Sequence, residues 1–160
     1  PVAHSVQESQ IEATVPRSSN LRLAKVYNEE DRDRFLDSAI EYMAKFFEST
    51  LAQLNHRNPS VDTRFRWIDG SNFAVTVYRD GSAVACCKIG KGGRYFKGIT
   101  YAGDDNAPGD TINDLLHVVT DKQGISLSPM MYGYGAEPTQ KLSLEGAAEY
   151  YWAKLIGPLQ

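Results

Sequence analysis

The residues best suited to bind a ligand in this 160-residue sequence are basic and aromatic side chains that alternate with apolar ones between residues 63 and 89. Successive side chains of a β-strand point to opposite faces, so we predict that Arg64, Arg66, Tyr78 and Lys88 share the face opposite Phe65 and the core. Guanidinium and ammonium groups bind phosphates and carboxylates, and an aromatic ring offers a stacking surface. We therefore expect an anionic ligand, such as a nucleotide or single-stranded nucleic acid, or an acidic protein surface. The alternative is a solvated face, which antiparallel sheets commonly have.

A glycine-rich turn, Gly90-Lys91-Gly92-Gly93-Arg94, follows Lys88 and could hold a phosphate with its backbone N–H groups. Lys91 and Arg94 therefore join the candidate ligand-binding residues. The segment lacks the Gly-Lys-Ser/Thr ending of a P-loop, and a strand instead of a helix is predicted after it. A plain hairpin turn explains the same glycines, because glycine is the usual residue where a chain reverses tightly.

The patterns of common metal and catalytic sites are incomplete in this sequence. Residues 104–106 resemble the start of a calcium loop, but Pro108 and Leu115 occupy positions at which an EF-hand needs oxygen ligands. A helix followed by three strands is also typical of metal-dependent nucleases, in which an acid stands two positions before a catalytic lysine. Here Cys86 precedes Lys88, and a thiol does not replace the hard oxygen ligand that magnesium requires. We expect no metal and no cofactor, and a binding protein is favoured over an enzyme.

Charge is unevenly distributed along the chain. Residues 61–97 carry seven basic and three acidic side chains, a local charge of +4, whereas the remaining residues carry ten basic and seventeen acidic ones, a charge of -7. The net charge of -3 argues against a general nucleic-acid-binding protein. The basic middle segment indicates a localised anion-binding surface on an acidic body.

A long amphipathic helix between Asn28 and Arg57 is the element that the predicted sheet must cover. Its apolar residues recur every three or four positions and form one stripe. Asn28 is the predicted N-cap, and Asp31 occupies the position that completes a capping box. The dipeptide at 58–59, Asn-Pro, ends the helix because proline disfavours helical backbone before it.

Strands are predicted after this helix, because the hydrophobic period changes from 3.6 to 2. Four segments form an antiparallel meander, at residues 63–68, 73–79, 83–89 and 95–101. Asp80-Gly81 is the strongest hairpin signal among the turns. Residues 112–119 could be a fifth strand or a short helix, 125–130 add a further strand, and a last helix follows the N-cap Ser143 and ends at Gly157. The predicted fold class is α+β, with a long N-terminal helix and a C-terminal helix packed on an antiparallel meander of about six strands.

Two parts of the chain are distinguished by their composition. Residues 1–27 are polar and predict a flexible arm or linker, in which Leu21, Leu23, Val26 and Tyr27 dock as a short extended piece. Residues 28–160 have the size of one α+β domain. Because the chain starts at Pro1, an upstream domain could be missing from it.

The location expected from the sequence is the cytoplasm. No apolar run approaches the length of a membrane-spanning helix, so we expect no contact with a membrane. Cys86 and Cys87 are the only cysteines, and as neighbours in a strand they point to opposite faces. We expect both to be free thiols in a reducing compartment.

Three segments resemble the domain that follows the TIR domain in some bacterial TIR-containing proteins. They are the run Asp31-Arg32-Asp33-Arg34-Phe35-Leu36, the hairpin Asp80-Gly81, and the ending Ala147-Ala148-Glu149-Tyr150-Tyr151-Trp152 through Pro158-Leu159-Gln160. The resemblance covers residues 25–160. In such proteins the NAD-cleaving chemistry belongs to the TIR domain, which is not in this chain. The resemblance implies a partner domain that senses, binds or oligomerises, and it assigns no functional residues.

The function expected from these observations is that of a non-catalytic recognition or assembly module, as the sensing or oligomerising part of a larger bacterial protein. The alternative is an enzyme or binding domain that acts on a phosphate-bearing ligand through the basic sheet face and the glycine turn. We expect a monomer or a helix-mediated dimer, because the charges of Lys88, Lys91, Arg94 and Lys97 would discourage pairing between sheet edges.

Overall fold

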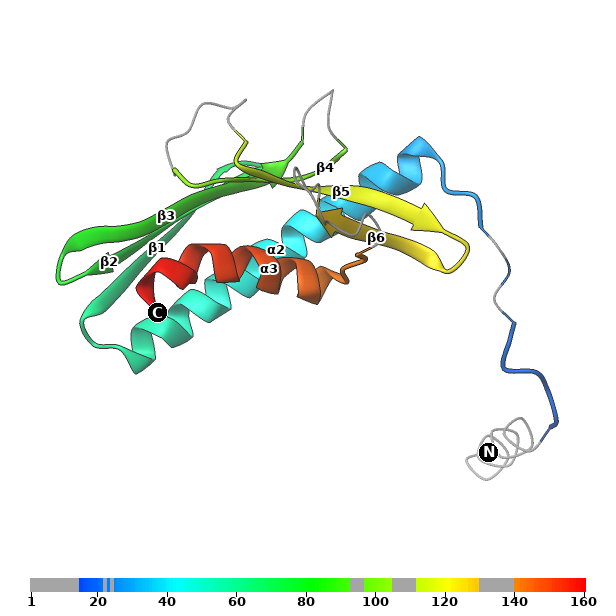
Figure 1. Ribbon diagram of the computed structural model, residues 1–160, viewed down its shortest axis with the longest axis horizontal. Coiled ribbons are helices and arrows are strands. Elements are labelled where there is room, and N and C mark those ends of the chain that lie inside the picture. Colours follow the sequence, from blue (N-terminus) through cyan, green and yellow to red (C-terminus); the bar gives the residue numbers. More distant parts are fainter. Residues whose placement is uncertain (1–14, 22, 24, 93–96, 105–111, 130–139) are drawn as a thin grey trace, which may run out of the picture.

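The computed structural model places two α-helices against one face of a six-stranded antiparallel sheet (Figure 1), which confirms the predicted α+β class. The structure describes residues 15–21, 23, 25–92, 97–104, 112–129 and 140–160. In chain order the elements are α2 (Glu29–Arg57), β1 (Val61–Asp69), β2 (Asn72–Arg79), β3 (Ser82–Lys91), β4 (Gly98–Ala102), β5 (Asp114–Asp121), β6 (Gly124–Pro129), α3 (Leu144–Ile156) and the 3₁₀ turn η1 (Gly157–Leu159).

Helix α2 begins at the predicted capping box. The Asn28 side chain accepts a hydrogen bond from the Asp31 backbone N–H (2.8 Å), and the Asp31 carboxylate accepts one from the Asn28 N–H (3.1 Å). The helix ends at Asn58, in extended backbone. Its buried stripe packs on the sheet and consists of Leu36, Ala39, Ile40, Met43, Ala44, Phe47 and Leu51. With 29 residues the helix is about 43 Å long, since each residue adds ~1.5 Å.

The strands follow one another in the sheet in the order of the sequence, β1 to β6. Between β2 and β3 the chain reverses through Asp80 and Gly81, whose φ angles of 52° and 82° are both positive. A two-residue hairpin loop of this kind matches the twist of the strands that it joins, which is why Asp-Gly predicts it well. The fifth segment, which the sequence left open between strand and helix, is strand β5.

Aromatic rings join the two helices to the sheet. The Phe47 ring on α2 lies 5.7 Å from the ring of Phe73 on β2 and 5.6 Å from that of Trp152 on α3. On the other side of α3, the buried Tyr151 hydroxyl donates a hydrogen bond to the Ile99 carbonyl of β4 (2.5 Å). These contacts fix α3 beside α2 on the same sheet face (Figure 1).

One expectation from the sequence was wrong in detail. Leu21, Leu23 and Val26 do not dock on the domain, since their side chains are 64%, 85% and 93% exposed, whereas Tyr27 is half-buried. The predicted end of the last helix is confirmed, because Gly157 is the C-cap of α3, and its φ of -49° carries the chain into η1. The start predicted for the fourth strand, residues 95 and 96, lies outside the described residues, and β4 is described from Gly98.

Neither α2 nor α3 combines the length and the hydrophobicity of a helix that crosses a membrane.

Candidate functional site

The register of the first three strands gathers four of the predicted ligand-binding residues on one face of the sheet. Arg64 lies opposite Thr76, and Arg66 lies opposite Ala74, which in turn faces Lys88 on β3. Phe73 and Val75 alternate with these β2 residues and belong to the core under the helices. The basic side chains therefore point away from α2 and α3. We call this surface, formed by Arg64, Arg66, Ala74, Thr76, Tyr78 and Lys88, the basic face.

The basic face has short residues along its middle strand and long ones on the strands beside it. Ala74 and Thr76 on β2 are only 2% and 6% exposed, although α2 and α3 both lie on the opposite side of the sheet (Figure 1). Their burial is consistent with the aliphatic stems of the neighbouring arginines and lysine covering them. Arg64 is exposed, and Arg66 and Lys88 are half-buried. The charged ends of these side chains lie on both sides of β2, where they can bind a phosphate-bearing group.

Two carboxylates limit where an anion can lie on this face. Asp62 lies opposite Tyr78, and its carboxylate accepts a long hydrogen bond from the Asn55 side chain (3.4 Å). Asp69, at the end of β1, has its pKa lowered by hydrogen bonds from Asn72 and from the Ser71 backbone, with a further contribution from the charge of Lys88. An anion on the basic face is repelled least between these two acids, near Ala74 and Thr76. Arg66 and Lys88 also interact within the protein itself.

Lys91, the lysine of the glycine turn, does not join the basic face. Lys91 lies opposite Ile99 on the side of the sheet that α2 covers, and its ammonium group is 2.8 Å from the Asp37 carboxylate of that helix. Arg94 lies outside the described residues. Gly90 has a packing reason to be glycine, because a Cβ there would meet the Asn72 side-chain oxygen at 1.8 Å.

Lys97 resembles Lys91 in joining the sheet to α2 by ion pairs. Its ammonium group lies 2.7 Å from the Asp33 carboxylate and 3.4 Å from that of Glu29. The hydrogen bond from Lys97 holds the pKa of Asp33 below its ordinary value of 3.8. Of the described basic residues in this segment, Lys91 and Lys97 therefore pair with α2, whereas Arg64, Arg66 and Lys88 lie on the basic face.

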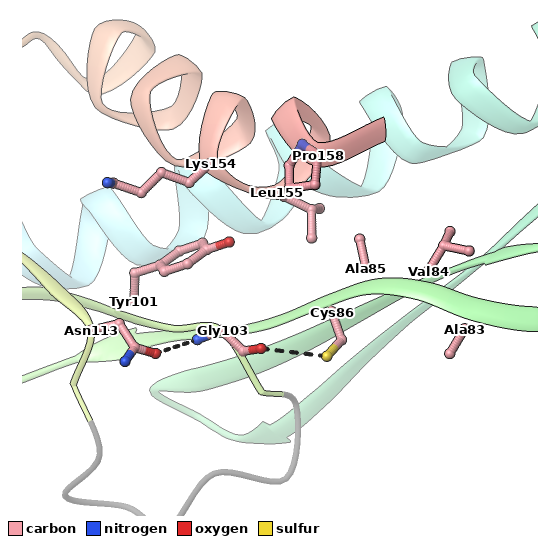
Figure 2. A pocket seen from close by; sticks show the side chains of 10 residues that line it. All are labelled: Ala83, Val84, Ala85, Cys86, Tyr101, Gly103, Asn113, Lys154, Leu155 and Pro158. Carbon is pink, nitrogen blue, oxygen red and sulfur yellow. Dashed lines mark hydrogen bonds between the residues drawn. The ribbon is translucent and has the colours of Figure 1, made fainter. Parts of the chain in front are cut away.

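A hollow of about 470 Å³ between β3 and the end of α3 was not predicted (Figure 2). Strand β4 leaves the sheet at Gly103, whose N–H donates to the Asn113 side chain (2.6 Å) and whose carbonyl lies 3.6 Å from the Cys86 sulfur. The lining residues are Ala83, Val84, Ala85, Cys86, Tyr101, Gly103, Asn113, Lys154, Leu155 and Pro158. Because the hollow depends on the unequal lengths of β3 and β4, no local sequence signal indicates it.

A polar cluster beside this hollow holds α3 against β5. The Asp114 carboxylate accepts a hydrogen bond from the Tyr150 hydroxyl (3.0 Å) and lies 2.7 Å from the Lys154 ammonium group. Burial is the largest cause that raises the pKa of Tyr150 and of Tyr101, and both phenols stay protonated at neutral pH. They can donate hydrogen bonds but cannot act as bases. Among the residues that the structure describes, no three His, Cys, Asp or Glu side chains are grouped to hold a metal ion.

Comparison with known proteins links the chain to a family through sequence. The model of the Y4lF protein domain matches residues 62–157. A protein of Sinorhizobium fredii called "Uncharacterized protein y4lF" is 43% identical over 158 residues, which cover 91% of this chain and 46% of that protein. The chain therefore spans about half the length of this relative. No solved structure matches the chain.

Proposed function

We propose that this chain, which belongs to the Y4lF family, is a non-catalytic recognition module that binds an anionic ligand on its basic face. One observation carries the proposal: the strand register gathers Arg64, Arg66, Tyr78 and Lys88 around the short residues Ala74 and Thr76, on the side away from the helices. The ligand classes that fit are a nucleotide or a single-stranded nucleic acid, in which phosphates pair with the cations and a base stacks on tyrosine.

The electrostatic part of this binding has a measurable size. For single-stranded nucleic acid, log K falls with log salt with a slope of about -0.7 per phosphate contact, so three contacts through Arg64, Arg66 and Lys88 give a slope of about -2. Raising the salt concentration fourfold should therefore weaken binding about 20-fold. Binding that does not depend on salt would not use this face.

The test is a pair of charge-matched double variants. Arg64→Glu with Arg66→Glu should abolish binding and leave the melting temperature close to that of the parent, because both residues lie on the solvent side of an edge strand. The control, Lys45→Glu with Lys122→Glu, makes the same change in net charge at exposed positions on α2 and in the β5–β6 turn. It should bind like the parent. Fluorescence anisotropy or calorimetry against single-stranded DNA, RNA, NAD and ADP-ribose, at low and moderate salt, measures both.

The outcomes separate the versions of the proposal. Equal loss in both double variants would mean that only the net charge matters and would refute a defined site. No binding to any of the four probes would remove nucleotides and nucleic acid and leave an acidic protein surface as the partner. An enzyme acting through the glycine turn has less support, because Lys91 is paired with Asp37 and Gly90 is explained by packing against Asn72.

The cellular context belongs to the same proposal. Cys86 and Cys87 are both free thiols, which supports a location in the reducing cytoplasm. The relation to proteins with a TIR domain stays a prediction, and the sequence of the native reading frame upstream of Pro1 would test it. A role as the sensing or assembling part of a larger protein is compatible with a relative about twice as long as this chain.

A further inference from the structure

In the part of the chain that the structure describes, the first six residues of strand β3 have a partner strand on one side only. Residues Lys88 to Lys91 pair with β4, whereas the preceding residues, Ser82 to Cys87, pair only with β2 among the described residues. The reason is that β4 has five residues and leaves the sheet at Gly103, while β3 has ten. We call residues 82–87 the open edge of β3.

The open edge presents backbone groups that can bind another strand. The Gly92 N–H donates to the Gly98 carbonyl (2.8 Å), so the backbone groups of Gly92 point toward β4. Because this direction alternates along a strand, the backbone groups of Cys86 point the same way as those of Gly92. Beside Cys86, however, β4 has already ended. The side chains of residues 82–87 carry no charge. Native sheets usually protect an exposed edge with charged residues, as β1 does here with Asp62, Arg64 and Arg66.

The hollow lies directly beside this edge. Its opposite wall is the C-terminal end of α3, with Leu155 and Pro158, and the Tyr101 ring lies between the two (Figure 2). An edge strand beside a helix is a surface on which extended peptides add a strand, with backbone hydrogen bonds to the edge and alternate side chains in the hollow. A volume of about 470 Å³ can accept such side chains.

The arm of this protein has the properties of such an added strand. Leu21 and Leu23 alternate along it, and both side chains are exposed in the single chain, as is that of Val26. Seven residues from 21 to 27 span about 23 Å when extended, and the six-residue open edge spans about 20 Å. Residues 15–27 contain three basic and no acidic residues. Two acidic residues stand close to the open edge along the chain: Asp80 lies in the turn before β3, and Asp104 follows the end of β4.

The arm cannot reach the open edge of its own chain. The Asp80 N–H donates to the Ser60 carbonyl (2.9 Å), so the hairpin next to the open edge lies at the C-terminal end of α2. The arm joins α2 at the other end, about 43 Å away along the helix. Residues 21–27 cover only about half of that distance.

We propose that residues 21–27 of one copy add as a strand to the open edge of β3 in a second copy, and that two copies exchange arms reciprocally to form a dimer. The arrangement buries the exposed leucines and covers an uncharged edge in one step. It differs from the helix-mediated dimer expected from the sequence, because the contacts involve the arm, β3 and the end of α3, and leave the outer surface of α2 in solvent.

The first test compares two arm variants of the full chain by light scattering after size-exclusion chromatography. The parent should have twice the chain mass at micromolar concentration. Leu21→Asp with Leu23→Asp should be monomeric, whereas Ser18→Asp with Ser19→Asp, which adds the same charge outside the strand segment, should remain dimeric. All these residues are exposed in the single chain, so unfolding of the domain cannot cause the difference. A monomeric parent, or a dimer that persists in the leucine variant, would overturn the proposal.

The second test identifies the docking surface with the native thiol of Cys86. Arg22→Cys, Ala24→Cys and Val26→Cys are made one at a time and oxidised mildly; these positions alternate with the leucines and therefore share the face of Cys86, which lies opposite Thr76 on the side away from α3. A disulfide forms only where two Cα atoms come within about 7 Å, so one register should cross-link to a dimer and the others should not. Cys87 is fully buried and cannot take the place of Cys86 in the disulfide. Adding Cys86→Ser should therefore abolish the cross-link. Failure of all three positions to cross-link would exclude the open edge as the arm's binding site.

Discussion

Replacing Phe47 by alanine tests whether the contact between the two helices and the sheet holds the domain together. The Phe47 side chain is fully buried, and its ring meets Phe73 from the sheet and Trp152 from α3 at 5.6–5.7 Å between ring centres. Phe→Ala changes in well-packed cores cost about 3–5 kcal/mol, because the lost burial is added to the cost of a cavity. Two aromatic partners from different elements limit how far the site can collapse, so we expect about 4 kcal/mol here.

That cost is a large part of the ~5–15 kcal/mol by which domains are usually stable. For a chain of this size it should lower the melting temperature by about 8–16 °C. Urea unfolding followed by circular dichroism should show a lower midpoint with an unchanged slope. The control is Phe46→Ala, the neighbouring residue, whose half-buried ring lies 6.0 Å from that of Phe47. If Phe47→Ala melted within a degree of the parent, or if Phe46→Ala cost as much, α2 would not pack on the sheet as described.

Two further substitutions test how the sheet and α3 are joined. Gly98→Ala should destabilise the domain by about 1–3 kcal/mol, because the new Cβ would meet the Leu116 carbonyl oxygen at 2.1 Å. The control is Gly70→Ala, which should melt like the parent because no atom lies within 4 Å of its Cβ position. Equal effects of the two alanines would contradict the close approach of β4 and β5. Tyr151→Phe should cost about 0.5–1.5 kcal/mol of unfolding free energy, since it removes one buried hydrogen bond and keeps the ring; a neutral effect would mean that the bond to Ile99 contributes nothing.

The elements that the sequence predicted best are those with local signals. The capping box of Asn28 and Asp31 and the hairpin of Asp80 and Gly81 are each specified by residues a few positions apart, and both were confirmed. The fifth segment was ambiguous because its pattern suits both strand and helix. It forms a strand because β4 and β6 pair with it on its two sides, and a single-sequence pattern does not contain that information.

The candidate site shows the same limit. Alternation was sufficient to predict that Arg64, Arg66 and Lys88 share a face. It did not show that Lys91 pairs with Asp37, because that contact joins residues 54 positions apart. The prediction that the arm docks on the domain was wrong for a different reason. Apolar residues that alternate before a helix indicate that the segment docks on some surface, but the pattern does not say whether that surface belongs to the same chain.

The contact between Phe47 and Trp152 also has a consequence for how the protein is made. It joins residues about a hundred positions apart. Of the two helices, α2 leaves the ribosome first with its apolar stripe exposed, and each hairpin of the meander can pair as soon as it leaves the exit tunnel. The part of the sheet face that α3 covers stays open until α3 itself has been released. A nascent chain should therefore carry an uncovered apolar surface from the release of α2 to the release of α3, and chaperone binding should fall once α3 can dock.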